Sequence, residues 1–149
     1  MTGASRAATA PAAALGCALA LTLAARALLL LVTVEGASME PTHHEGDRLL
    51  MLRRPVARLR RGRVVVVRGP FTPPGRPAGG GARYAVKRLA ALPHQPVPAG
   101  TAASHGIVPP GRVAVLGDNP DHSTDSREWG LISERRIIGV VLGRISTAR

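Results

Sequence analysis

Val64-Val65-Val66-Val67, between Arg63 and Arg68, is the stretch of sequence that decides the fold. β-branched side chains fit a pleated, buried surface, so four of them in a row predict a buried strand. No segment after Ser38 carries the apolar period of a long helix. The body of the chain is therefore expected to consist of strands.

Short apolar runs of strand length lie on both sides of the valines. They are Leu49–Leu52, Tyr84–Val86, Val113–Leu116 and Ile137–Leu142. The stretches 69–82 and 93–110 are rich in Pro and Gly and predict irregular connections. Together these patterns predict a mainly β protein whose compact antiparallel domain has roughly 110 residues and one core.

An apolar segment precedes this domain, because residues 7–34 are apolar apart from Arg26 and a few small polar residues. About twenty such residues span a bilayer, so one N-terminal transmembrane helix is expected at residues 8–25. A cleavable signal peptide is the alternative, but its apolar region is usually about 7–15 residues long, which favours an uncleaved anchor. The stretch 28–34 predicts a buried strand that leads to Ser38.

The chain is thus expected to have two parts. Residues 1–27 would form a cytoplasmic stub and membrane anchor, and residues 28–149 an extracytoplasmic β-rich domain in a single-pass cell-membrane protein. Arg6 precedes the helix and acidic residues outnumber basic ones just after it, which favours a cytoplasmic N-terminus. The arginine-rich run 53–63 argues the other way, although long translocated domains largely escape the charge rule. That run is interpreted as a solvated face or as a contact for anionic lipid head groups.

Composition argues against nucleic acid as a partner. The net charge of +11 favours anionic partners, but the aromatic residues are only Phe71, Tyr84 and Trp129. Stacking platforms for single strands need more aromatic side chains, and the spacing of zinc fingers or basic zippers is missing. We therefore expect membrane lipid, and not nucleic acid, as a binding partner.

The sequence also predicts neither a metal nor any other cofactor. Cys17 is the only cysteine, so the chain has no intrachain disulfide and no cysteine metal site. His43 and His44 are adjacent and point apart on an extended chain. The aspartates Asp121 and Asp125 lack the Gly and Glu of a calcium loop.

Lys87 is the only lysine among twenty basic residues, and the other nineteen are arginine. Arginine stays protonated at any workable pH, whereas a desolvated lysine amine can lose its proton and act as a base. A position that keeps lysine in such a chain suggests that charge alone does not suffice there. Ser38 is the candidate partner, because a serine nucleophile with a lysine base is an alternative to the Ser-His-Asp triad.

Several motifs extend this pair. The chain carries, in order, Ser38-Met39-Glu40-Pro41-Thr42, Gly46-Asp47, Tyr84-Ala85-Val86-Lys87-Arg88, Gly117-Asp118-Asn119, Ser123, Asp125-Ser126-Arg127 and Trp129-Gly130. Over roughly residues 34 to 145 the chain resembles the type I signal peptidases, including the inner-membrane peptidases of mitochondria. The resemblance implies a β-rich catalytic domain on a membrane anchor. It also implies removal of N-terminal signal peptides from exported preproteins after small residues, at sites of the Ala-x-Ala type.

The resemblance assigns a role to each matching residue. Ser38 corresponds to the nucleophile, which forms an acyl-enzyme, and Lys87 to the general base. Ser123 corresponds to a serine that hydrogen-bonds and orients the lysine amine. Asp125 and Arg127 correspond to a structural ion pair that braces the same loop.

The lysine must lose its proton to work. Its ordinary pKa is about 10.4, and burial beside the apolar side chains of Met39 and Val86 is the expected means of lowering it. The backbone N–H of Ser38 is expected to stabilise the oxyanion, since the position two residues earlier is Gly36 and offers no hydroxyl.

Gly36, Met39, Ala85 and Val86 are expected to bind the substrate, as walls of shallow pockets for alanine-sized side chains. The substrate would pair as an added strand along such an edge.

Some residues depart from the family pattern. His43 stands where an apolar residue is usual, Arg63 where an aspartate is usual, and Leu92-Pro93-His94 where Pro-Gly-Asp is usual. These departures bear on activity and on the range of substrates.

Two alternatives stay open: a dedicated maturation peptidase for one substrate, and a non-catalytic, membrane-anchored relative that only binds peptides. Other serine–lysine enzymes fit less well. Penicillin-binding proteins use Ser-x-x-Lys, but Tyr84 lies three residues before Lys87. The SOS-response repressor autoproteases carry a DNA-binding domain where this chain has its predicted anchor.

Overall fold

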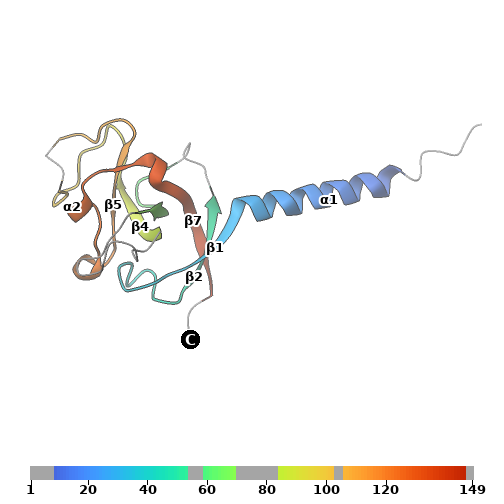
Figure 1. Ribbon diagram of the computed structural model, residues 1–149, viewed down its shortest axis with the longest axis horizontal. Helices are drawn as coiled ribbons and strands as arrows, with labels where there is room; N and C mark the ends of the chain where they lie inside the picture. Colours follow the sequence, from blue (N-terminus) through green and yellow to red (C-terminus); the bar gives the residue numbers. More distant parts are fainter. Residues whose placement is uncertain (1–8, 54–58, 70–83, 103–105, 147–149) are drawn as a thin grey trace, which may run out of the picture.

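The computed structural model describes residues 9–53, 59–69, 84–102 and 106–146. Helix α1 (Thr9–Leu28) projects away from a β-rich body (Figure 1). The strands of the described body are β1 (Leu29–Thr33), β2 (Arg48–Arg53), β3 (Val64–Arg68), β4 (Tyr84–Ala91), β5 (Arg112–Leu116), β6 (Ile132–Ser133) and β7 (Ile137–Ser146). Three short helices connect the last strands: η2 (Pro120–His122), α2 (Ser126–Trp129) and η3 (Glu134–Arg136).

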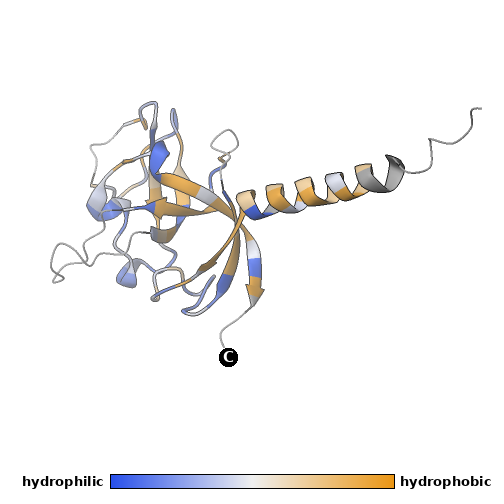
Figure 2. Ribbon diagram, turned by 45° about the vertical axis from the view of Figure 1, so that its right-hand side comes forward, coloured by the Kyte–Doolittle hydropathy of each residue, from blue (hydrophilic) through white to orange (hydrophobic). Residues whose placement is uncertain are grey.

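These strands form one antiparallel sheet in the order β1-β2-β7-β3-β4-β5-β6. The sheet curls, and apolar residues run along several of its strands (Figure 2). Strand β7 lies between β2 and β3 and pairs with both. The mainly β, antiparallel fold expected from the sequence is confirmed.

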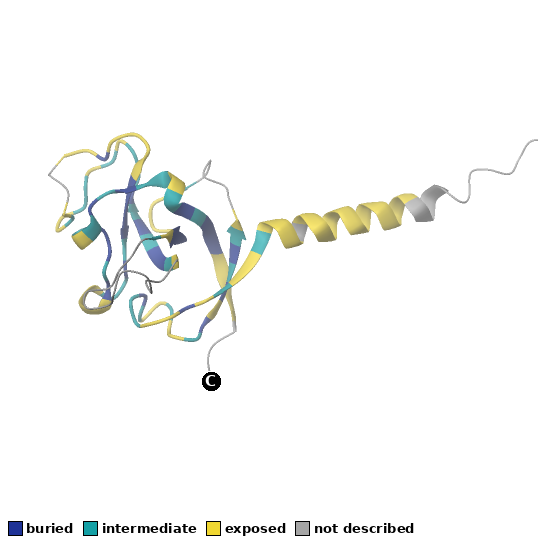
Figure 3. Cartoon of the chain, in the orientation of Figure 1, coloured by how far each residue is buried: buried dark blue, intermediate teal, exposed yellow. Residues whose placement is uncertain are grey.

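Buried residues gather in the β-rich body, whereas α1 is exposed along most of its length (Figure 3). The valine run lies in β3, and its side chains contribute to two hydrophobic clusters. Val65 and Val67 pack into a first cluster with residues of β4, β5 and β7, whereas Val66 packs into a second cluster with residues of β2 and with Met39. Because both faces of β3 are covered, its sequence is a continuous apolar run instead of an alternation.

The other predicted runs also lie in strands, with one correction. The stretch 28–34 was expected to be a buried strand; it does contain β1, but Leu31 is 51 % exposed and only Val34 is buried. The reason is that β1 is an edge strand, paired with β2 alone. The irregular stretch 69–82 lies outside the described residues apart from Gly69, as do residues 54–58 of the arginine-rich run.

Helix α1 exposes its apolar side chains, including Leu15, Leu19, Leu21 and Leu23. Among the described residues, the helices fall short of the combined length and apolarity that crossing a bilayer requires. The transmembrane helix predicted for residues 8–25 is therefore unconfirmed.

Candidate active site

Lys87 lies in the middle of β4, opposite Val65 of β3, and is 4 % exposed. Its Nζ donates a hydrogen bond to Ser123 Oγ at 3.0 Å. Among the described residues no carboxylate lies within ion-pair distance of this amine. The side chain is thus held at its tip by a neutral hydroxyl inside the protein.

The hydroxyl of Ser123 leads directly to a buried carboxylate. Ser123 Oγ donates to Asp125 Oδ2 at 2.7 Å, and the Gly117 N–H donates to the same oxygen at 2.7 Å. The Arg127 guanidinium binds both carboxylate oxygens, at 3.0 Å from Nε and 2.6 Å from Nη2. Asp125 is 0 % exposed, so these donors replace the water that it gives up.

Local sequence explains how this loop reaches the lysine. The loop leaves β5, passes through η2, which has a proline in its first turn, and enters α2. Asp125 is the N-cap of α2 and accepts a hydrogen bond from the backbone N–H of Arg127. Ser126 Oγ accepts a hydrogen bond from Val115 N, which fastens the helix to β5. Ser123 is carried to Lys87 by these contacts.

The charges of the site follow from burial and hydrogen bonding. Burial lowers the pKa of Lys87 from 10.5 to about 8; the charge of Asp125 opposes this shift and that of Arg127 assists it. Burial acts to raise the pKa of Asp125, but hydrogen bonds from Arg127, Gly117 and Ser123 outweigh it and hold this pKa below its ordinary value. The site therefore pairs a fixed carboxylate with an amine that loses its proton readily.

Ser38 lies half-buried in the turn between β1 and β2. Its carbonyl oxygen accepts a hydrogen bond from Asn119 N at 3.1 Å, and a Cβ added at Gly117 would overlap both that oxygen and Ser123 Oγ. The turn that carries Ser38 and the loop that carries Ser123 are thus in contact across Gly117. Between these described residues, no hydrogen bond joins the Ser38 hydroxyl to Lys87 Nζ.

A further set of hydrogen bonds, which sequence reasoning missed, joins the turn that carries Ser38 to β4. Arg88 binds Asp118 through two nitrogens, at 2.7 Å and 2.6 Å, and Thr42 Oγ1 donates to Asp118 Oδ2 at 2.6 Å. Arg88 Nη1 also donates to the carbonyl oxygen of Gly62 at 2.7 Å. The Tyr84–Arg88 motif contained the signal, but one arginine among nineteen has nothing to mark it.

The expected substrate residues differ in how accessible they are. Gly36 is exposed with φ of 78°, a backbone conformation that favours glycine. Ala85 is half-buried, while Val86 lies in the second core cluster with Met39. Met39 is fully buried, so in this structure its side chain is not accessible to a substrate and packs beneath the expected binding surface.

Three residues that depart from the family pattern, His43, Arg63 and His94, differ in burial and in their contacts. His43 is half-buried beside Asp47, and burial lowers its pKa. Its Nδ1 is buried and has no hydrogen-bond partner in the part of the chain that the structure describes. Arg63 is exposed, and its backbone carbonyl accepts a hydrogen bond from Leu89 N. His94 is exposed in a turn with φ of 65°.

Comparison with known proteins places the chain in a family. Residues 7–101 and 94–145 match the family model described as "Signal peptidase, peptidase S26". The mitochondrial inner membrane protease subunit 1 of Xenopus tropicalis is 32 % identical over 120 residues, which cover 76 % of this chain and 67 % of that protein.

Two bacterial relatives match shorter segments. Signal peptidase I of Haemophilus influenzae is 45 % identical over 40 residues, which cover 27 % of this chain and 12 % of that protein. Signal peptidase I of Buchnera aphidicola is 53 % identical over 36 residues, which cover 24 % of this chain and 12 % of that protein. The matches thus span a small part of the bacterial relatives and two thirds of the mitochondrial one. Because the family model covers most of the sequence, the chain belongs to the peptidase S26 family of signal peptidases.

Proposed function

We propose that this protein is a membrane-bound serine endopeptidase that removes N-terminal signal peptides from exported preproteins after small residues. In this proposal Ser38 is the nucleophile and Lys87 is its general base. The observation that carries it is the buried amine of Lys87, which donates a hydrogen bond to Ser123 and, among the described residues, forms no ion pair with a carboxylate.

The lowered pKa supplies the neutral base. With a pKa of about 8, about a tenth of the amine is unprotonated at pH 7, whereas an ordinary lysine has less than about a thousandth. Catalysis by a base of this kind works best when its pKa lies near the working pH. Activity is therefore expected to rise with pH as Lys87 loses its proton.

The hydrogen bonds around Ser123 orient that base. The single hydroxyl proton of Ser123 is donated to Asp125, so Ser123 can only accept a hydrogen bond from Lys87. An unprotonated Lys87 then donates an N–H to Ser123 and keeps its lone pair free. That lone pair can take the proton of Ser38, and such contacts often tighten only when substrate binds.

The reaction then follows in two balanced steps. Ser38 Oγ bonds to the scissile carbonyl carbon while Lys87 takes the hydroxyl proton, and Lys87 returns that proton to the leaving amine as the peptide bond breaks. Water then attacks the acyl carbon and gives a proton to Lys87. The bond between that carbon and Ser38 Oγ breaks, Lys87 returns the proton to Ser38 Oγ, and the signal peptide leaves with a free carboxyl terminus. The backbone N–H of Ser38 has no acceptor among the described residues and is proposed to donate to the oxyanion.

The proposal includes attachment to the cell membrane. Residues 1–27 would form the cytoplasmic stub and anchor, and residues 28–149 the extracytoplasmic catalytic domain. The exposed leucines of α1 support this, since a bilayer would cover them. Two experiments test this arrangement. Membranes are extracted with alkaline carbonate, and release of the protein contradicts the anchor. Intact cells are digested with protease, and protection of residues 28–149 contradicts their extracytoplasmic location.

A dedicated maturation peptidase and a binding-only relative remain the competing functions. A groove that only binds peptides needs no buried lysine, and burying an amine costs free energy. The intact arrangement of Lys87, Ser123 and Asp125 therefore favours an enzyme.

The decisive experiment is cleavage of several unrelated preproteins with Ala-x-Ala sites in detergent, from pH 6 to 10. Wild type is expected to gain activity as the pH approaches 8, and Ser38→Ala and Lys87→Arg are each expected to lose about a thousandfold or more in kcat. Arg112→Lys, at an exposed position on β5, is the matched control and should stay active.

An active Lys87→Arg variant contradicts the role of Lys87. Cleavage of only one preprotein indicates a dedicated peptidase. If wild type cuts nothing and a β-lactone probe fails to label Ser38, the binding-only function is correct.

A further inference from the structure

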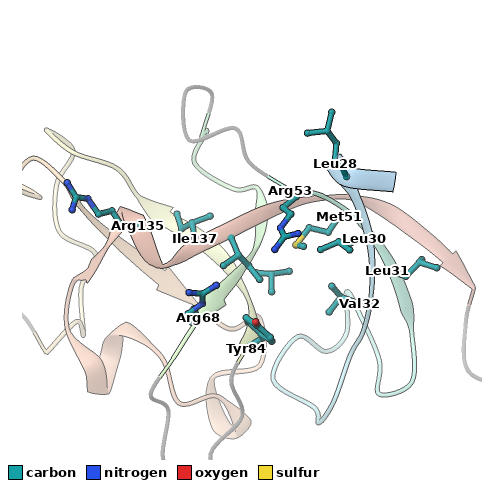
Figure 4. A pocket seen from close by; sticks show the side chains of 13 residues that line it. Leu28, Leu30, Leu31, Val32, Met51, Arg53, Arg68, Tyr84, Arg135 and Ile137 are labelled. Carbon is teal, nitrogen blue, oxygen red and sulfur yellow. The ribbon is translucent and has the colours of Figure 1, made fainter. Parts of the chain in front are cut away.

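A cavity of about 1030 Å³ opens at the end of the body where α1 leaves it (Figure 4). Leu30 and Val32 of β1, Met51 of β2, Val66 of β3 and Ile138 of β7 are among its apolar lining residues. Curling of the sheet brings these strands around one space, although β1 and β3 are not neighbours in the sheet. The site described above does not include any of them.

The apolar lining continues to the candidate active site. Met51 and Val66 belong to the same core cluster as Met39 and Val86, which lie next to Ser38 and Lys87 in the sequence. Tyr84, three residues before Lys87 on β4, also lines the cavity. At about 3.3 Å per residue this is roughly 10 Å, so a peptide extended along β4 reaches the cavity about three residues from its scissile bond.

The cavity also carries unneutralised positive charge. Arg53 of β2, Arg68 at the end of β3 and Arg135 of η3 line it, and none of the described lining residues is acidic. Within the described residues these three guanidinium groups form no ion pair. The contrast is with Arg88, Arg127 and Arg144, each of which has an aspartate partner.

We propose that this cavity selects substrates with an acidic residue about three to six positions before the cleavage site. The inference rests on the proposed function. Arg68, which is paired with Tyr84 across β3 and β4, is the arginine nearest to the expected path of the peptide. The three guanidinium groups are exposed, so they attract a carboxylate with the modest strength of a surface charge pair, which added salt weakens.

The apolar lining assigns the cavity to the part of the substrate before the cut. A signal peptide places its apolar segment there, and Leu30, Val32 and Ile138 offer that segment a matching surface. In the proposed arrangement, this end of the body is also the one nearest the membrane. An acidic requirement next to apolar residues would narrow the range of substrates and so favour a dedicated peptidase.

The test uses the full-length protein and peptides with one Ala-x-Ala site that carry Glu, Gln or Lys at each of the third to sixth positions before the cut. Binding is measured with Ser38→Ala and kcat/KM with wild type, both in a neutral detergent. A preference for Glu over Gln of about fivefold to tenfold is expected at one position, weakening with added salt. The triple variant Arg53→Gln, Arg68→Gln, Arg135→Gln should lose the preference, so that its kcat/KM values for the Glu and Gln peptides are equal. Arg112→Gln is the matched control and should retain it.

The outcomes separate this inference from the proposed function. Cleavage without any preference for Glu overturns the inference and leaves the peptidase intact. Preferential binding of Glu peptides to Ser38→Ala, with no cleavage by wild type, supports the cavity and contradicts the peptidase. If instead the triple variant loses binding to phosphatidylglycerol vesicles, with no peptide preference in wild type, the arginines bind lipid head groups and the inference is wrong.

Discussion

Lys87 and Arg88 are neighbours on β4, their side chains point to opposite faces, and each is connected to an aspartate of the same loop. Arg88 touches its aspartate directly, with 2.6 Å between Nη2 and Asp118 Oδ2, and this hydrogen bond raises the pKa of Arg88. Lys87 is connected to Asp125 only through the hydroxyl of Ser123, and burial lowers its pKa to about 8. Two adjacent cations thus lie in opposite electrostatic environments.

The difference teaches how a buried lysine can be fixed in place and still give up its proton. A carboxylate in direct contact would stabilise the ammonium form, as Asp118 stabilises the charge of Arg88. One hydroxyl between the two groups keeps the geometry of a hydrogen-bonded chain but removes the direct ion pair. Burial then outweighs the remaining attraction to Asp125.

The largest expected effect on stability comes from replacing Asp125, the buried aspartate of the two. Asp125→Ala should lower the free energy of unfolding by about 3–5 kcal/mol, because it leaves the Arg127 charge and the Gly117 N–H without their partner. In wild type the folded-state pKa of Asp125 is depressed, so its contribution is present above the ordinary pKa and is lost as the pH falls through the lowered one. Urea unfolding measures both effects, and a loss below about 1 kcal/mol at pH 7 would contradict a buried, fully used carboxylate.

Replacing the lysine should act in the opposite direction. Lys87→Met is expected to abolish activity and to raise the free energy of unfolding by about 3 kcal/mol at pH 7, since burial depresses the pKa of Lys87. The unfolded chain binds more protons than the folded one between pH 8 and 10.5, so the stability of wild type should rise across this window and the difference should shrink. Urea unfolding from pH 7 to 10.5 checks it. Equal stability of the two proteins at pH 7 would mean that the amine is solvated.

Removing the hydroxyl of Ser123 should lower activity less than replacing Lys87 does. Ser123→Ala is expected to lower kcat about a hundredfold, because Lys87 loses the acceptor that orients its amine. The rising limb of the pH profile should stay near pH 8, since burial is the main cause of the lowered pKa. Single-turnover rates across pH give both quantities. A kcat within twofold of wild type would show that Ser123 does not position the base.

The smallest effect is expected on the exposed side. Asp118→Ala removes a partly exposed pair with Arg88 and should lower the free energy of unfolding by about 1 kcal/mol without moving the pH profile. Thermal unfolding and the same pH series measure it. If this variant lost more stability than Asp125→Ala, the contrast between the two aspartates would be wrong.

Sequence reasoning predicted the features that leave a local signal, namely runs of apolar residues and residue types that are rare in this chain. The apolar runs around the four valines predicted the strands, and the lone lysine pointed to Lys87. The two-residue strand β6 is too short to leave a pattern. The exposure of β1 depends on its edge position, which is a property of the sheet order and not of its own residues.

Several contacts between distant residues were not predicted, although the family resemblance did indicate the one between Ser123 and Lys87. Arg88 and Asp118 are 30 residues apart, and arginines are so frequent here that none stands out. The position of Gly117 between the Ser38 carbonyl and Ser123 follows from the close approach of two loops. Arg53, Arg68 and Arg135 come from three separate elements and share a cavity only because the sheet curls.

The position of β7 has a consequence for biosynthesis. Ser38 follows β1 and Lys87 lies on β4, and in the sheet the last of the described strands lies between these two halves. A nascent chain that ends before Ile137 lacks the ladder between β2 and β3, so its two halves have no sheet contact to hold them in register. A copy of the chain therefore cannot complete the sheet that links the two halves until Ile137–Ser146 has been synthesised.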